Sequence, residues 1–254
     1  MTRPGIILVL AISAFAPNHQ ARTDATQGAL PRHGDPTPPP HRPLVGLVCH
    51  RLNDMDVRAL RAMRVTFVRL SLYANGDGAQ WIDRARAEGF DVLVVSYRTS
   101  ENRRTDRIRW PGVKWQYGNE PDWPHVAPTT AAVAARLTDV SPGLGHGTPR
   151  AWMQAFTAKM VPSRAPLAVH CYGEPLSGAI AGTLADARAS AGTRAIWFTE
   201  IGQKADAVDL DKALHLLVGT PVARVYVYAL WSESDGYTLT PAQRAVIRAF
   251  VEGR

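Results

Sequence analysis

Eight short apolar segments recur along the chain at intervals of 21 to 30 residues, and this regularity limits the possible folds more than any other feature. The segments begin near Leu44, Val65, Asp91, Val113, Val140, Pro166, Ala195 and Val225. Most are rich in Val, Ile and aromatic residues and are apolar on both faces, as expected of strands in a parallel sheet covered by helices. The Val140 segment (VSPGLG) has the weakest strand pattern of the eight.

Helical patterns fill most of the intervals. They lie near residues 53–63, 81–89, 127–137, 149–160, 180–191, 208–218 and 240–250. Asn53 and Thr240 are suitable N-caps, and Gly89 can end the second helix. Between the third and fourth strands we expect the helix to be short or missing. The alternation of strands and helices predicts an α/β fold, a small single-domain (β/α)8 TIM barrel.

A doubly wound open sheet is the competing fold. It usually carries a glycine-rich phosphate-binding turn after an early strand. Here the first strand runs straight into residues 49–52 (CHRL), without such a turn. The two cysteines, Cys49 and Cys171, fall on the first and sixth predicted strands, which are not neighbours. We therefore expect two buried thiols rather than a disulfide.

The first 43 residues differ in composition from the rest. Residues 1–21 contain an early arginine and a 12-residue apolar run, which is too short to span a bilayer and predicts a signal peptide. An uncleaved membrane anchor is the alternative. Residues 22–43 are proline-rich and predict a disordered linker. We expect residues 44–254 to be the folded domain of a secreted or periplasmic protein, with no stable membrane insertion once the signal peptide is removed.

The charge of the chain excludes little but narrows the partners. It carries 29 Lys and Arg against 22 Asp and Glu, a formal net charge of +7. The densest basic stretch, residues 103–109, is not a nucleic-acid-binding stripe, and we find no nucleic-acid motif, so we expect no nucleic-acid partner. The basic surface slightly favours an acidic partner. The histidines share no metal-ligand spacing, and we expect neither a metal nor a cofactor.

Polar and aromatic side chains cluster at the C-terminal ends of the predicted strands. They are Arg69 in the second strand, Asn119 and Glu120 at the end of the fourth, His170 and Tyr172 in the sixth, Glu200 in the seventh and Trp231 in the eighth. In a (β/α)8 barrel these ends meet at one mouth, where the active site lies. Each residue alone has an ordinary explanation as a helix cap, an ion-pair member or a packing residue. Their shared position favours a common function.

Two carboxylates that face each other across a cleft suit glycoside hydrolysis. One must hold a proton for the leaving oxygen while the other stays ionised, so their environments must push the two pKa values apart. Arg69 and Tyr172 are suited to stabilise Glu200 as an anion. Trp231 offers an apolar face to a sugar ring. Further aromatic residues that can line a sugar cleft, with loop packing as the alternative, are Tyr73, Tyr97, Trp123 and Tyr237.

These motifs resemble those of clan A glycoside hydrolases over about residues 44–254. Residues 118–122 (GNEPD) resemble the acid/base motif of the clan, and residues 197–202 (WFTEIG) resemble its nucleophile strand. Residues 170–173 (HCYG) are similar to the sixth-strand His-x-Tyr, and Arg69 matches the second-strand arginine. The resemblance implies a retaining mechanism, with Glu120 as acid and then base, Glu200 as nucleophile, and Asn119 holding the sugar 2-hydroxyl. It also implies carboxyl groups about 5–5.5 Å apart.

Within the clan, the order of the motifs is most similar to glycoside hydrolase family 128, the single-domain endo-β-1,3-glucanases. The segments that follow the family's order are residues 119–122, 141–142, 152–156, 169–173 and 196–200. Family 5 enzymes often carry a histidine after the third strand, where this chain has Ser96 and Tyr97. The loops that follow the second and third strands are usually richer in family 128 than they are in this chain.

The sequence therefore predicts a secreted retaining hydrolase that cleaves β-1,3-glucan internally. A clan A hydrolase of another polysaccharide, such as an exopolysaccharide or xylan, is the first alternative, and the basic surface slightly favours an anionic glycan. The second alternative is a non-catalytic glycan-binding barrel. In each case the partner is a polysaccharide or oligosaccharide, and we expect a monomer.

Overall fold

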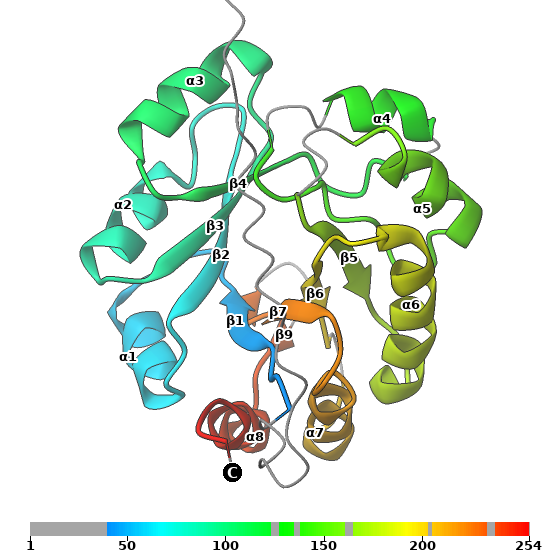
Figure 1. Cartoon of the computed structure of the whole chain (residues 1–254). Coiled ribbons are helices and arrows are strands. Elements are labelled where there is room, and N and C mark those ends of the chain that lie inside the picture. The colour runs from blue at the N-terminus through cyan, green and yellow to red at the C-terminus, as the bar shows by residue number, and fades with distance from the viewer. Residues whose placement is uncertain are drawn as a thin grey trace, which may run out of the picture. The chain divides into compact units, whose positions relative to one another are not determined.

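Seven parallel strands form the centre of the protein in a computed structural model (Figure 1). The structure describes residues 40–122, 127–134, 138–160, 165–202, 205–232 and 237–253. The strands are β1 (Leu44–Val48), β2 (Phe67–Leu72), β3 (Asp91–Ser96), β4 (Lys114–Tyr117), β5 (Leu167–Cys171), β6 (Ile196–Ile201) and β7 (Val222–Val227). Their order in the sheet is β4-β3-β2-β1-β7-β6-β5. This is the order of strands around a barrel opened between β4 and β5.

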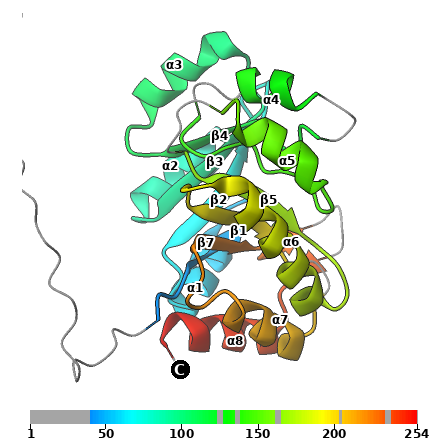
Figure 2. The same ribbon diagram turned by 45° about the vertical axis from the view of Figure 1, so that its right-hand side comes forward.

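Helices cover the outside of the curled sheet, as Figures 1 and 2 show. They are α1 (Asp54–Ala62), α2 (Ala79–Ala87), α3 (Ser100–Arg109), α4 (Pro128–Ala134), α5 (Arg150–Thr157), α6 (Leu176–Ala191), α7 (Ala207–His215) and α8 (Pro241–Val251). Asn53 and Thr240 cap α1 and α8 in reciprocal capping boxes, as predicted. Within the described ranges, no helix is both long and apolar enough to cross a membrane.

The helix between β3 and β4 corrects one expectation. We expected it to be short or missing, but α3 has ten residues. Its sequence lacks an apolar stripe. In the structure Ile108 is 71% exposed, and the side chain of Asp106 is buried. Arg98 Nη1 lies 2.7 Å from Asp106 Oδ1, so an ion pair anchors the helix where most helices use apolar side chains. Hydrophobic periodicity therefore gave no signal for it.

The fifth predicted strand, at Val140, is not formed as a regular strand. Instead, isolated parallel bridges join this segment to both edge strands: Gln116 to Val140, Asn119 to Gly143, and Leu144 to Val169. Pro142 has no N–H to donate to a ladder, which explains why the pairing is broken into single bridges. The fold is thus α/β and TIM-barrel-like, with an irregular segment where a full barrel has its eighth strand.

Two apolar layers fix the strands in place. The larger lies between the sheet and the helices, and the smaller lies inside the curl of the sheet and contains Trp197 and Tyr226. A Cβ atom at Gly46 would lie 2.7 Å from the Tyr226 ring, so the small residue on β1 makes room for the large one on β7. Large and small side chains thus fill the interior together.

The remaining sequence expectations concern the cysteines and the ends of the domain. Cys49 and Cys171 are both buried and free, as predicted. The predicted signal peptide lies outside the described residues, as do Trp123 and all but residues 40–43 of the predicted linker. Of these four, Arg42 Nη1 donates to the Phe250 carbonyl at 3.3 Å.

Candidate active site

The structure gathers the predicted polar residues at the C-terminal ends of the strands. Arg69 lies in β2, and Glu200 lies near the end of β6. Asn119 and Glu120 follow β4. His170 lies in β5, and Tyr172 is the first residue after that strand. Direct contacts link all six of these residues into one cluster.

Glu200 is held as an anion. Arg69 Nη1 lies 2.6 Å from its Oε1 atom, and the Tyr172 hydroxyl donates to its Oε2 atom. The residue is only 8% exposed. Burial by itself raises the pKa of this carboxyl, but Arg69, His170 and the Tyr172 hydrogen bond outweigh burial and lower the pKa to about 2. The pKa of Tyr172 is raised, first by burial and then by the charge of Glu200 and the hydrogen bond to it.

Glu120 lies in a more open setting. Its side chain is 35% exposed, and its Oε1 atom lies 2.9 Å from His170 Nδ1. Its backbone has a φ of +46°, in the left-handed region that residues other than glycine seldom adopt. The Glu120 N–H donates to the Gly143 carbonyl at 2.7 Å, which holds the residue in this conformation. The irregular segment between β4 and β5 therefore sets the position of Glu120.

His170 lies between the two carboxylates. Its side chain has no solvent exposure, and its Nε2 atom lies 3.5 Å from Glu200 Oε1, on the opposite side of the ring from Glu120. Gly143 packs against the ring so closely that a Cβ atom there would lie 2.2 Å from Nε2. The imidazole can therefore occupy this position only because residue 143 has no side chain. No sequence pattern singled out Gly143.

Asn119 is oriented by two donors. Its Oδ1 atom accepts from Arg69 Nη2 at 3.0 Å and from Gln116 Nε2 at 3.3 Å. Both bonds use Oδ1, so the side-chain NH₂ group is the one that can donate to a substrate hydroxyl. Gln116 was not among the predicted site residues, although its inward position on β4 follows from alternation along the strand.

The predicted aromatic residues are placed less uniformly. Trp231 begins β8 (Trp231–Ser232), which pairs with β9 (Tyr237–Thr238) after the parallel strand has ended. The Arg51 guanidinium carbon lies 3.3 Å from the centroid of its ring. Tyr73 and Tyr97 lie at the ends of β2 and β3 and stack on each other.

Tyr228 is the aromatic residue that the prediction missed. It follows β7 directly, and its ring lies 6.4 Å from that of Tyr172 in an edge-to-face contact. His50, after β1, lies 3.1 Å from the Tyr228 hydroxyl through its Nε2 atom. The strand that begins near Val225 was predicted to continue to Trp231, which placed Tyr228 within the strand instead of just after it. Its position as the first residue after a strand was the usable signal.

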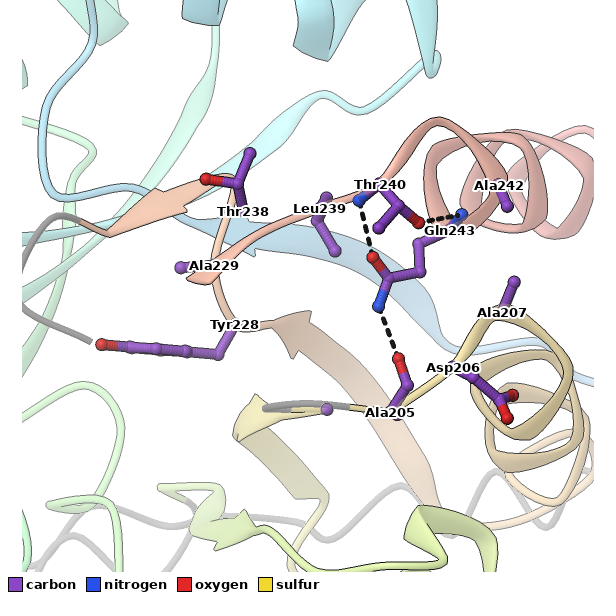
Figure 3. Close-up of a pocket in the computed structure, with 11 residues that line it drawn as sticks. Ala205, Asp206, Ala207, Tyr228, Ala229, Thr238, Leu239, Thr240, Ala242 and Gln243 are labelled. Carbon is purple, nitrogen blue, oxygen red and sulfur yellow. Dashed lines mark hydrogen bonds between the residues drawn. The ribbon is translucent and has the colours of Figure 1, made fainter. Parts of the chain in front are cut away.

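Tyr228, whose ring contacts Tyr172 of the cluster, also lines a pocket (Figure 3). Its wall includes the first turn of α8, where Gln243 donates from Nε2 to the Ala205 carbonyl at 2.5 Å and accepts from the Thr240 N–H at 2.6 Å. These polar groups are thus occupied by one another. Among the described residues, no group of three or more His, Cys, Asp and Glu side chains is placed to hold a metal ion.

Comparisons with known proteins support the fold. No protein-family model matches the chain. No curated protein matches it. Cellulose synthase subunit Z (CcsZ) from Clostridioides difficile is similar in structure, with a TM-score of 0.55, 7% identity, and coverage of 81% of this chain and 99% of that chain. The catalytic domain of alkaline cellulase K is similar with a TM-score of 0.50, 13% identity, and coverage of 83% and 88%. The fold is therefore like those of CcsZ and of this cellulase domain, and the likeness extends to the fold alone.

Proposed function

We propose that the protein is a retaining glycoside hydrolase of clan A, with Glu200 as nucleophile and Glu120 as acid/base. One observation carries the proposal: Glu200 in β6 and Glu120 after β4 contact opposite nitrogens of a single buried imidazole, in unlike surroundings. Glu200 is paired with a cation and buried, whereas Glu120 is partly exposed and has no arginine partner among its described contacts. Unlike surroundings are what two carboxylates need in order to take different roles.

In the first step, a Glu200 oxygen attacks the anomeric carbon, the bond to the leaving oxygen breaks, and Glu120 gives that oxygen its proton. Water then attacks the same carbon, Glu120 accepts the water's proton, and the bond to Glu200 breaks. The contacts of Arg69 and Tyr172 with Glu200 favour the ionised starting state of the nucleophile. Asn119, oriented through its Oδ1 atom, is suited to donate to the sugar 2-hydroxyl.

His170 contacts both carboxylates. Because Glu200 is ionised, the Nε2 atom that faces it is expected to carry a ring proton. The Nδ1 atom lies 2.9 Å from Glu120 Oε1. The buried ring therefore fixes the two carboxylates relative to each other. We assign His170 as a positioning residue.

We propose β-1,3-glucan as the substrate, cleaved internally, because the order of motifs is most similar to family 128. Two of the structural neighbours are a cellulose synthase subunit and a cellulase, so cellulose belongs among the substrates to be tested. Another polysaccharide hydrolase and a non-catalytic glycan-binding barrel are the alternatives. We also propose that the protein is secreted and acts as a monomer.

The test is product formation from laminarin, xylan, cellulose and an acidic exopolysaccharide by the full chain. Laminarin oligosaccharides that disappear in both Glu120→Gln and Glu200→Gln would support the substrate and both carboxylate roles. NMR of the first product should show retention of the anomeric configuration. Turnover of another glycan alone would contradict β-1,3-glucan but keep the reaction class. Binding without turnover in the parent protein would favour the glycan-binding barrel.

A further inference from the structure

An open hollow lies at the ends of β2 and β3. The residues that line it are Tyr73, Ala74, Asn75, Asp77 and Tyr97. Tyr73 is 47% exposed and Tyr97 is 44% exposed, which is unusual for two large aromatic side chains. Their rings stack at 5.6 Å between centroids and 8° between planes, so together they form one apolar platform.

The platform lies on the same rim of the sheet as the candidate active site. β2 and β3 are paired in register up to Leu72 and Ser96, which places the next residues, Tyr73 and Tyr97, side by side on the rim of the barrel. Tyr73 follows Arg69 by four residues, or roughly 13 Å along a strand. Burial raises the pKa of Tyr97, and the charges of Arg69 and Glu200 also act on it. The hollow is therefore an outer part of the same mouth.

A tight turn holds the polar side of the hollow in shape. The Tyr73 N–H donates to the Asp77 carbonyl at 3.0 Å, and Asn75 Nδ2 donates to Asp77 Oδ2 at 2.7 Å. Gly78 has a φ of +96°, and a Cβ atom there would lie 2.0 Å from the Ser71 carbonyl oxygen. Only glycine allows the turn to lie this close to β2. A ligand would meet a preformed surface and would pay little for ordering it.

We propose that this hollow is an outer subsite for a neutral pyranose of a glycan bound at the candidate active site. This inference rests on the proposed function. A pyranose has an apolar face that suits the tyrosine platform and hydroxyls that suit the amide of Asn75 and the carboxylate of Asp77. Asp77 is the charged residue among those lining the hollow, and its negative charge repels uronate and sulfate groups. The local charge thus opposes the anionic glycan that the net charge of the chain favours.

Binding to the Glu200→Gln variant tests the subsite without turnover. Isothermal titration calorimetry would compare laminarihexaose, laminaritriose and hexagalacturonate. We expect Tyr73→Ala and Tyr97→Ala to weaken laminarihexaose binding about tenfold, and by more than they weaken laminaritriose binding. Tyr73→Phe keeps the ring and should bind nearly as the parent does. Ile108→Ala, an exposed apolar position on α3, is the matched control and should change nothing.

The charge argument has its own variant. Asp77→Asn should strengthen hexagalacturonate binding at low salt, and this gain should shrink as salt is added. If the parent protein bound hexagalacturonate more tightly than laminarihexaose, the proposal of a neutral subsite would be overturned.

The subsite and the proposed function fail separately. Laminarin hydrolysis that is unchanged by Tyr73→Ala and Tyr97→Ala, together with unchanged laminarihexaose binding, would overturn the subsite and leave the hydrolase standing. Binding that depends on the two tyrosines, in a parent protein that hydrolyses no glycan, would support the subsite and contradict the hydrolase. No binding and no hydrolysis by a folded protein would contradict both.

Discussion

The two carboxylates of the candidate active site are built in different ways. Glu200 lies in the regular strand β6, is buried, and is held by an arginine and a tyrosine from two other elements. Glu120 follows β4, has a left-handed backbone and is steadied by the irregular Gly143 segment. In the proposed mechanism, regular strands thus fix the group that must stay charged. The less regular segment carries the group proposed to exchange protons with the leaving oxygen and with water.

The largest effect is expected from Glu200→Gln. It removes the proposed nucleophile, so initial rates on laminarin should fall on the order of 10⁴-fold or more. The amide keeps the shape of the side chain, and far-UV circular dichroism should stay that of the parent. If the variant kept the parental rate, Glu200 and its contacts would have a structural role only, and another residue would have to be the nucleophile.

Glu120→Gln should have the next largest effect, and the effect should depend on the substrate. Loss of a general acid typically lowers the rate by about 10²–10⁴-fold. A β-glucoside with a good leaving group, such as a dinitrophenyl glycoside, needs no protonation of that group. Its glycosylation step should therefore lose much less than that of laminarin, as single-turnover rates can measure. Equal losses on both substrates would contradict the acid role and would remove the proposed division between the two carboxylates.

The ionised state of Glu200 predicts a dependence of stability on pH. The folded pKa of about 2 lies below the ordinary value of 4.5, so the ionised group stabilises the fold above pH 4.5 and this contribution is lost as the pH falls toward 2. Across that range, the free energy of unfolding should fall by about 3 kcal/mol more in the parent than in Glu200→Gln, as urea titrations can measure.

Tyr172→Phe removes one of the hydrogen bonds that lower this pKa. The variant should show a smaller difference over the same pH range, because its loss still begins near pH 4.5 but is complete at a higher pH. Parallel stability curves for the parent and Glu200→Gln would mean that the carboxyl titrates alike in the folded and unfolded chains.

The same contrast separates what the sequence allowed us to predict from what it did not. Strand β6 has a strong apolar pattern, and the prediction placed Glu200 correctly near its end. The Val140 segment has a weak pattern because Pro142 and its glycines give no strand signal, although it positions Glu120 and His170 through backbone contacts. Alternation along a strand says nothing about a left-handed residue or a ring packed on a glycine. Helix α3 was missed for a related reason, since a buried ion pair anchors it.

Gly143→Ala should have the smallest effect of these variants and tests the irregular side directly. The added Cβ atom would lie 2.2 Å from His170 Nε2 and 3.0 Å from Gln116 Nε2, so the imidazole must move. Overpacking of this kind costs about 1–3 kcal/mol of the free energy of unfolding, as denaturant titration can measure. A displaced His170 should also lower the rate on laminarin roughly tenfold, because both carboxylates contact it.

The matched control is Gly182→Ala, the same substitution at an exposed position within α6, where nothing lies within 4 Å of the added atom. There alanine should raise the free energy of unfolding by about 0.5–1 kcal/mol, because it restricts the unfolded chain and favours the helix. If Gly143→Ala behaved like this control in both stability and rate, the close packing of His170 on Gly143 would not be what holds the ring between the carboxylates. Glu120 would then depend on its own backbone contacts, and the two halves of the site would be independent.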